Sequence, residues 1–398
     1  MNTKEIIQTV EDHYMPVFVR YDIVLSYGEG PYVYDHNGKQ YLDFLAGIAV
    51  NVLGHAHPGL VAAISNQAGK MIHCSNLYYT EVQAKLVQTL AAASGLDKVF
   101  LANSGAEANE GAIKLARKYA KQTHSKKTDI ITANNCFHGR TLATLTATAQ
   151  PKYQEGYEPL PGGFHYVPFN DIDALKAALS ERTCAIFLEP IQGEGGINMP
   201  DEEYLKQVRA LCDATGTLLI LDEIQTGMGR TGTLFAYEQY GIKPDIVTLA
   251  KGLGGGVPIG AFIASNKVAS AFHSGDHGST FGGNPLAAAA ANQVLAVMEQ
   301  EKLTENARKV GKYLEEGLLV LQAKYPALIT RVRGRGLMLG AELSMPGRDI
   351  VNACLEKGII INCTAGNVLR FVPPLIIERV HVDQAMAVLD AVLAAYGA

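Results

Sequence analysis

The chain has 398 residues, of which 48% are hydrophobic and 18% charged, and its net charge is -5 at pH 7. Because single hydrophobic cores stop growing at about 250 to 300 residues, a chain of this length is predicted to divide into two domains. Acidic and basic residues are scattered along the sequence, which argues against binding to nucleic acid or to an anionic membrane and in favour of a small-molecule substrate.

The first half of the chain begins with turn-rich strands. Residues 30–44 carry a typical hairpin turn at Asn37-Gly38. Short apolar runs then alternate with helical stretches, at 98–102, 129–133, 184–190, 217–223, 245–252 and 260–265. This alternation indicates an α/β fold. Since the strands are apolar almost throughout, the sheet is predicted to be mostly parallel, covered on both faces, with ligands beyond the carboxyl ends of its strands.

The second half is predicted to begin with a helical region over residues 286–323. Strands at 331–343, 358–363 and 368–377 then alternate with helical segments, and the chain closes on a helix from about His381. We interpret this region as a smaller α+β lobe. The N-terminal strands could join either lobe.

The segment 100–120 is predicted to be a strand, a turn at Gly105 and a helix. Ser104 and Glu107 fit a capping box, so the free N–H groups of Gly105 and Ala106 could hold a phosphate at the positive end of the helix dipole. On this stretch alone, an ordinary capped helix is the simpler interpretation.

Two further motifs flank the predicted strands. Phe137 could cover a flat ring, and Arg140 could bind a carboxylate in bidentate fashion. Ser279 and Thr280 lie in a glycine-rich loop and offer hydroxyls for a phosphate, although the same residues are typical of plain turns.

Asp222 and Glu223 end one buried strand, and Lys251 follows the next one. A buried carboxylate costs several kcal/mol, by rough estimate, unless a cation or hydrogen bonds meet it. A lysine among apolar and glycine neighbours has its pKa lowered, which suits imine formation with a carbonyl. Taken singly, a salt bridge for the acid and an exposed position for the lysine are the commoner cases.

Several functional classes lose support. The stretch GMGRTG at residues 227–232 matches G-x-G-x-x-G, but a lone match is only a weak indication of a nucleotide site, and neither G-x-x-x-x-G-K-[ST] nor G-x-S-x-G is present. The histidine pairs at 55/57 and 273/277 lack a third ligand, so no metal is expected. The six cysteines are far apart, without a Cys-x-x-Cys pair, which indicates reduced thiols and a cytoplasmic location. No signal peptide or membrane span is recognisable.

A phosphate cradle, a stacking aromatic, a buried carboxylate and an imine-forming lysine are together what pyridoxal 5'-phosphate requires. The chain resembles the class III (omega) aminotransferases over nearly its whole length. The motifs that carry the resemblance include YLDFLAGIAVNVLGHAHP, ANSGAEANEGAIKLAR, FHGRTLATL, EPIQGEGG, LDEIQTGMGRTG, AKGLGGGVPIGA and GSTFGGNPLA.

The resemblance implies a type I fold for pyridoxal-phosphate-dependent transferases. A large domain with a mostly parallel central sheet, residues 46–285, would hold the cofactor, and both chain ends, residues 1–45 and 286–398, would form the small α+β domain. It also implies a homodimer whose active sites lie at the subunit interface.

For the cofactor, the resemblance implies that Lys251 forms the imine and that Asp222 pairs with the pyridine nitrogen. Gln225 would contact the phenolic oxygen, and Phe137 would stack on the ring. The remaining contacts implied with the cofactor are Gly105, Ala106, Glu223, Ile224 and Thr280, of which Thr280 would reach across from the partner subunit.

For the substrates, the resemblance implies that an amine donor, N2-acetylornithine first among the candidates, gives its terminal amino group to 2-oxoglutarate. Arg140 would bind the far carboxylate, with Ser279 close by. Arg370 would be the second anchor for 2-oxoglutarate, and Glu194 would mask it when the donor binds. Tyr14 is similar to a tyrosine near the entrance of ornithine-type members, so ornithine, succinylornithine and 4-aminobutyrate stay open as donors.

Two other classes of function stay open at this point. In a non-catalytic or nucleotide-binding α/β protein, the glycines would be loops and Lys251, Asp222 and Arg140 ordinary surface or salt-bridged groups. Another reaction on the same cofactor, such as that of an aminomutase or a decarboxylase, is less consistent with a Glu194/Arg370 gate, which is useful when two substrates take turns.

Overall fold

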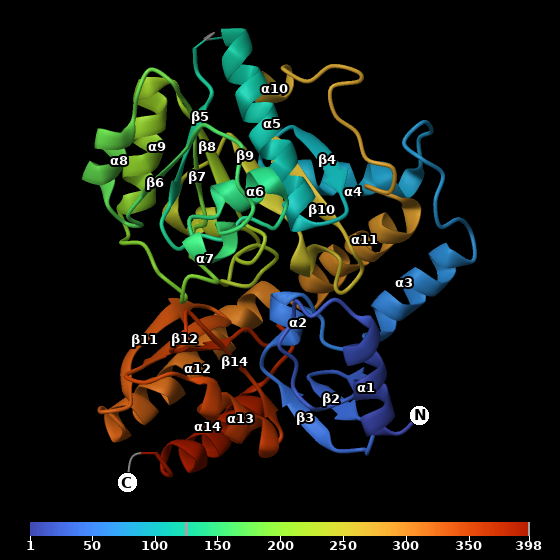
Figure 1. Ribbon diagram of the computed structural model, residues 1–398. Helices are drawn as coiled ribbons and strands as arrows, with labels where there is room; N and C mark the ends of the chain where they lie inside the picture. Colours follow the sequence, from blue (N-terminus) through green and yellow to red (C-terminus); the bar gives the residue numbers. More distant parts are fainter. Residues whose placement is uncertain (124–125, 397–398) are drawn as a thin grey trace.

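Figure 1 shows the computed structural model, which describes residues 1–123 and 126–396. The upper part of the molecule contains the middle of the chain, and the lower part brings the N-terminal and the C-terminal segments together. No helix in these two ranges is both long and apolar enough to cross a membrane.

The upper part is built on a seven-stranded sheet in the order β4-β10-β9-β8-β7-β5-β6. All neighbours from β9 to β6 are parallel, whereas β10 runs antiparallel to both β4 and β9. The prediction of a mostly parallel α/β sheet is therefore confirmed. The strands are β4 (Lys98–Ala102), β5 (Asp129–Ala133), β6 (Phe164–Val167), β7 (Thr183–Leu188), β8 (Leu218–Asp222), β9 (Ile246–Leu249) and β10 (Gly260–Ala264).

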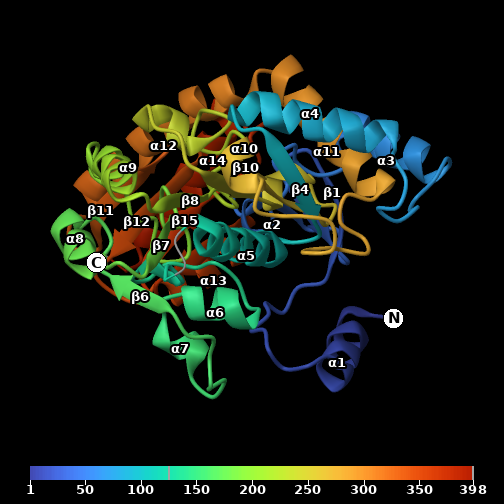
Figure 2. The same cartoon turned by 90° about the horizontal axis from the view of Figure 1, so that it is seen from above.

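The two faces of this sheet contribute to separate hydrophobic clusters. Leu219 and Val247 belong to the larger cluster, while their neighbours Ile220 and Ile246 belong to a smaller one that includes one side of α5 (Gly105–Thr123). Figure 2 shows α5 on one face of the sheet and α4 (Glu81–Ser94) and α11 (Pro285–Gln300) on the other. Because successive side chains of a strand point to opposite faces, strands that are apolar at every position require this double cover.

Most other helices surround the same sheet. The region predicted as helical over 286–323 is interrupted, because α11 ends at Gln300 and Lys302 adopts a left-handed conformation with φ of 53°. The remaining elements of the upper part are α3 (Pro58–Ala68), α6 (Leu142–Ala147), α7 (Pro151–Gln154), α8 (Ile172–Ala178), α9 (Tyr204–Thr215), α10 (Asn266–Ala269) and the 3-10 turns η1 (Ala236–Tyr240) and η2 (Lys251–Leu253).

The lower part contains two four-stranded sheets, β1-β2-β3-β13 and β11-β12-β15-β14. The hairpin predicted at Asn37-Gly38 joins β2 to β3, and β13 from the C-terminal region pairs in parallel with β3. The strands are β1 (Leu25–Glu29), β2 (Tyr32–Asp35), β3 (Gln40–Asp43), β11 (Ile329–Arg335), β12 (Met338–Leu343), β13 (Ile359–Ile360), β14 (Asn362–Thr364) and β15 (Val368–Phe371).

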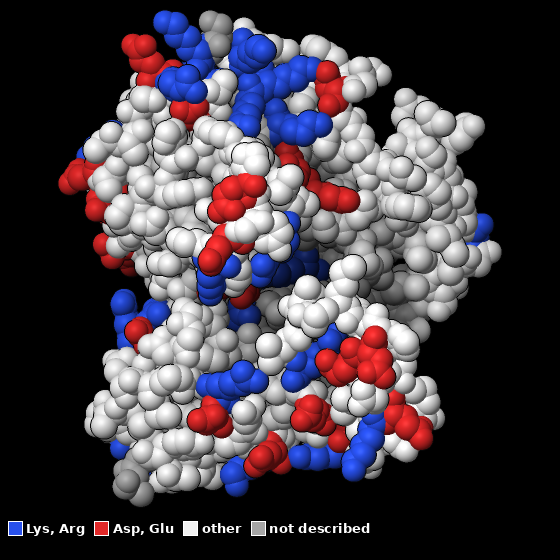
Figure 3. All heavy atoms as spheres, in the orientation of Figure 1, with Lys and Arg blue, Asp and Glu red and all other residues white. Residues whose placement is uncertain are grey.

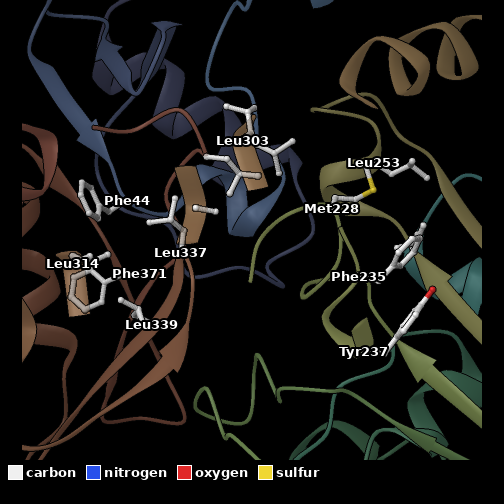
Figure 4. Packing of buried hydrophobic residues seen from close by; sticks show 14 of the residues in the cluster. Phe44, Met228, Phe235, Tyr237, Leu253, Leu303, Leu314, Leu337, Leu339 and Phe371 are labelled. Carbon is white, nitrogen blue, oxygen red and sulfur yellow. The ribbon is translucent and has the colours of Figure 1, made fainter. Parts of the chain in front are cut away.

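The hydrophobic core of the lower part also joins the two chain ends. Phe44 meets Phe371 edge to face, with 6.5 Å between the ring centroids, and Leu314 and Leu339 lie beside them (Figure 4). The domain limits 1–45, 46–285 and 286–398 stay a prediction, which this shared core supports. The helices here are α1 (Thr3–His13), α2 (Ala46–Ala49), α12 (Leu303–Lys324), α13 (Arg348–Glu356) and α14 (Arg379–Leu393).

Candidate active site

A cavity of about 380 Å³ opens beyond the carboxyl ends of the central strands. Segments that follow β4, β5, β7, β8 and β9 line it, because these strands are parallel to one another and end at the same edge of the sheet. Figure 3 shows a hollow between the upper and lower parts of the molecule with basic atoms beside it, while acidic and basic side chains are interspersed over much of this face.

Asp222 ends β8 and is buried at the wall of the cavity. Its Oδ2 accepts a hydrogen bond from Asn109 Nδ2 at 2.8 Å and lies 2.8 Å from His138 Nδ1, and its Oδ1 accepts from the backbone N–H of Ile224 at 3.0 Å. These partners compensate the burial of the carboxylate. They also fix its orientation.

His138 is fully buried behind Asp222 and stacks on Phe187, with 3.9 Å between the ring centroids. Burial disfavours the charged form, but contacts with Cys136 and Asp222 outweigh it and hold the pKa of His138 well above 6.5. A protonated His138 places a positive charge beside the Asp222 carboxylate.

Lys251 begins η2 directly after β9, and its side chain reaches the same cavity. Burial lowers the pKa of Lys251 below its usual value, while the charge of Glu194 opposes this effect and that of Arg370 adds to it. A lowered pKa increases the neutral fraction of the amine, which is the form that attacks a carbonyl and accepts a proton.

The N-terminus of α5 lies at the edge of the cavity, with Ser104, Gly105 and Ala106 among its lining residues. Ser104 Oγ accepts from Glu107 N–H at 3.2 Å, whereas the Glu107 carboxylate bonds Asn103 N–H instead of Ser104 N–H, so the predicted capping box is only half formed. A Cβ on Gly105 would come within 2.8 Å of the end of the Ile224 side chain, so any larger residue here would have to displace that side chain.

Phe137 and Arg140 also face the cavity. The backbone N–H of Phe137 donates to Glu189 Oε2 at 3.0 Å. The Arg140 guanidinium lies over the Tyr153 ring at 3.9 Å from its centroid and makes no ion pair with any described carboxylate. Arg140 is exposed and is therefore available for a carboxylate of a substrate.

Glu194 lines the cavity and forms an ion pair with the buried Arg370. Gln225 joins them, because its Nε2 donates to Glu194 Oε1 at 3.2 Å and its Oε1 accepts from Arg370 Nη1 at 3.3 Å. Burial alone would raise the pKa of Glu194, but the charges of Arg370 and Lys251 lower it to about 2. Glu194 therefore stays ionised at physiological pH.

A family model described as Aminotransferase class-III matches residues 14–393. The chain belongs to the class III aminotransferases. Two similar relatives are both named acetylornithine aminotransferase. The protein of Methanocaldococcus jannaschii is 54% identical over 393 residues, 98% of each chain, and that of Caldanaerobacter subterraneus is 55% identical over 388 residues, which cover 97% of this chain and 98% of the relative.

Solved structures of class III enzymes share the fold. The ornithine aminotransferase of Toxoplasma gondii superimposes with a TM-score of 0.96 at 36% identity, covering 100% of this chain and 96% of its own. The acetylornithine aminotransferase of Elizabethkingia anophelis gives a TM-score of 0.89 at 36% identity, covering 99% and 100%. The predicted fold of type I pyridoxal-phosphate-dependent transferases is thus confirmed.

The cofactor of class III aminotransferases is pyridoxal 5'-phosphate, and the cavity fits it. Lys251 offers an amine, Asp222 a buried carboxylate and Phe137 an aromatic ring, and Gly105 lies at a helix N-terminus. All four residues line the same cavity. When bound, the cofactor supplies an electron sink for the bond that breaks next to the transferred nitrogen.

Five of the predicted site residues are not among those that line this cavity, and one of them is Arg370, which is buried and paired with Glu194. Glu223 accepts hydrogen bonds from the backbone N–H groups of Ala236 and Tyr237 at 3.0 and 2.9 Å, and its contact with the cofactor stays a prediction. Tyr14 and Thr280 are exposed, and Ser279 Oγ accepts from Asn103 Nδ2 at 3.1 Å. Contacts of these three with a bound ligand stay predictions.

Sequence reasoning missed three residues of the site: Asn109, His138 and Glu189. Asn109 interrupts the apolar face of α5 next to Ala112, and a polar residue at such a position was a recognisable signal. Burial raises the pKa of Glu189 to about 7, against the opposing charge of His138. No local pattern distinguished Glu189 or His138 from ordinary residues at strand ends.

Proposed function

We propose that the enzyme transfers the terminal amino group of N2-acetylornithine to 2-oxoglutarate, which gives N-acetylglutamate 5-semialdehyde and glutamate in arginine biosynthesis. The observation that carries this proposal is a pair of arginines, of which Arg140 lines the cavity without an acidic partner among the described residues and Arg370 is covered by Glu194, itself a lining residue. The names of the relatives at 54 and 55% identity support the same substrates.

The two arginines suit the two substrates in turn. Acetylornithine presents a terminal amine without a carboxylate beside it, so Arg140 would bind its distant α-carboxylate while Glu194 stays on Arg370. 2-Oxoglutarate has a carboxylate at each end, so one would bind Arg140 and the other would displace Glu194 from Arg370. The same cavity thereby accepts a monocarboxylate amine and a dicarboxylate.

The chemical step relies on Lys251 and Asp222. Lys251 would hold the cofactor covalently in the resting enzyme and, once released as a neutral amine, would take the proton from the substrate carbon that carries the amino group. Asp222, fixed by His138 and Asn109, would keep the ring nitrogen protonated. Phe137 would stack on the ring, and Gln225 would orient it.

We further propose a homodimer in which Thr280 contacts the cofactor phosphate of the partner subunit. Large apolar side chains are exposed in three places: near the N-terminus, at residues 77–79 and next to Thr280. Such exposure is unusual for the surface of a free monomer. Examples are Phe18, Leu77, Tyr79 and Phe281, with exposed fractions of 61, 82, 103 and 60%. A cytoplasmic location is part of the same proposal, since all six cysteines are free thiols.

The visible spectrum of the purified holoenzyme tests the cofactor and the donor together. The yellow colour should bleach with acetylornithine at far lower concentration than with ornithine, succinylornithine or 4-aminobutyrate, and 2-oxoglutarate should restore it. Borohydride reduction should attach a pyridoxyl group to Lys251. Bleaching at lower concentration by another amine would refute the proposed donor, and absence of the adduct would refute the proposed role of Lys251.

A further inference from the structure

The buried guanidinium of Arg370 has a third partner, Asn362. In the antiparallel ladder between β14 and β15, Asn362 is directly opposite Arg370, and Thr364 is opposite Val368. Side chains of directly opposed residues lie side by side on the same face of a sheet. The Asn362 amide is thereby placed beside the guanidinium, and its Oδ1 accepts a hydrogen bond from Arg370 Nε at 3.1 Å.

The three partners of Arg370 differ in charge. Glu194 carries the only negative charge among them, whereas Asn362 and Gln225 offer neutral amide oxygens. Asn362 bonds Nε, and Glu194 bonds Nη1, so the contact with Asn362 can persist when Glu194 leaves. A carboxylate that replaces Glu194 would then meet a guanidinium that is already oriented and still fully charged.

The backbone on both sides of the pair is fixed. Leu369 and Phe371, the neighbours of Arg370, point into the hydrophobic core, where Figure 4 shows Phe371 beside Phe44. On the other side, Thr364 Oγ1 donates to the backbone carbonyl of Glu194 at 2.5 Å. Because both main chains are held, the pair can open by rotation of the Glu194 side chain alone.

We propose that Asn362 is a positioning residue for the acceptor half of the reaction. It holds the Arg370 guanidinium in the orientation that binds a dicarboxylate while Glu194 moves away, and its neutrality leaves the charge of Arg370 to the substrate. This inference rests on the proposed function, in which 2-oxoglutarate displaces Glu194. Asn362 would not contribute to the donor half, during which Glu194 remains on Arg370.

The test compares Asn362→Leu and Asn362→Asp with the wild-type holoenzyme, using glutarate, an unreactive dicarboxylate, as the probe in calorimetry. Loss of one hydrogen bond to a charged group predicts a dissociation constant for glutarate about tenfold higher in Asn362→Leu. Asn362→Asp keeps the size of the side chain but neutralises Arg370, so it should weaken glutarate at least as much.

The KM for 2-oxoglutarate should rise in parallel in both variants, while the KM for acetylornithine stays within about twofold of the wild-type value. Cys363→Ala is the matched control, because Cys363 is the next residue of β14 and points to the opposite face, and it should leave both constants unchanged.

Two results would overturn the role of Asn362 and leave the proposed function intact. In the first, both Asn362 variants bind glutarate as tightly as the wild type, while Arg370→Ala loses this binding. In the second, the KM values for donor and acceptor rise equally in the Asn362 variants. Failure of the wild-type enzyme to bind glutarate would overturn the proposed function as well. A purely structural role for Asn362 predicts instead that Asn362→Leu raises the KM values of donor and acceptor alike.

Discussion

Replacing Glu194 by glutamine removes the charge that covers Arg370 while keeping the shape of the side chain. Burial alone would raise the pKa of Glu194, but the charges of Arg370 and Lys251 lower it from 4.5 to about 2. At about 1.4 kcal/mol for each pKa unit, this net difference of roughly 2.5 corresponds to about 3 kcal/mol in favour of the ionised Glu194 in this site, to which Arg370 contributes more than Lys251. A substrate carboxylate has to overcome this free energy before it can bind Arg370.

Because solvent reaches about a quarter of the Glu194 side chain, with 24% exposed, the full 3 kcal/mol is an upper limit. The glutamine variant should therefore bind 2-oxoglutarate between about 10 and 200 times more tightly. It should also accept acetylornithine less well when 2-oxoglutarate is present, since an uncovered Arg370 attracts the carboxylate of the competing dicarboxylate. Stopped-flow absorbance of the acceptor half-reaction measures the first effect, and the donor half-reaction followed with and without added glutarate measures the second.

If Glu194→Gln shows the same preference between donor and acceptor as the wild type, Glu194 does not control the access of substrates to Arg370. The pKa of about 2 adds a second criterion. Glu194 is ionised throughout the range from pH 6 to 9, so the ratio of kcat/KM values for donor and acceptor should show no step caused by this residue there. A step that disappears in Glu194→Gln would mean that the pair opens by protonation and not by displacement.

Three further predictions concern other parts of the molecule. Lys251→Ala should lower the rate of single-turnover transamination by at least about 10³-fold. The variant should also lose its cofactor on gel filtration, whereas the wild type retains it. A near-normal rate would refute the role of this lysine. Burial raises the pKa of Glu223 from 4.5 to about 7, so the stability that Glu223 contributes is complete below pH 4.5 and is lost as the pH rises through 7. Between pH 4.5 and 7, the Tm measured by thermal denaturation should fall less for Glu223→Gln than for the wild type. If Tm changes with pH in the same way in both proteins, the raised pKa of Glu223 is contradicted. When Lys251→Ala and Thr280→Ala protomers are mixed in equal amounts, half of the dimers contain one protomer of each kind, and each such dimer has one complete site. The mixture should therefore show about a quarter of the wild-type activity at limiting cofactor. Activity equal to the mean of the two separate variants would refute a contribution of Thr280 to the partner's site.

The central sheet and the two residues at its edge could be predicted because local patterns determine them. Uniformly apolar strands require a sheet covered on both faces, and the ends of parallel strands meet, so Asp222 and Lys251 were expected together. The same strand geometry limits the prediction, since adjacent residues point to opposite faces. Only one of Asp222 and Glu223 could face the cavity, and the sequence alone does not tell which one.

Contacts between distant segments could not be predicted from the residues themselves. Glu194 and Arg370 are 176 positions apart, and neither has a local feature that indicates an ion pair. They were expected only through the family resemblance. His138 and Asn109, which hold Asp222, were missed because their role depends on how α5 and the segment after β5 pack beneath the strand end.

The pairing of β13 with β3 has a consequence for the order in which the chain folds during synthesis. Lys39 and Glu356, which are bonded next to this ladder, are separated by 317 positions, so the N-terminal sheet stays incomplete until almost the whole chain has left the ribosome. The seven-stranded sheet is finished by Ala264 and can form earlier. Because contacts over such distances form late, docking of the two chain ends is expected to be the last step of folding, and chaperones would encounter the exposed N-terminal strands for most of that time.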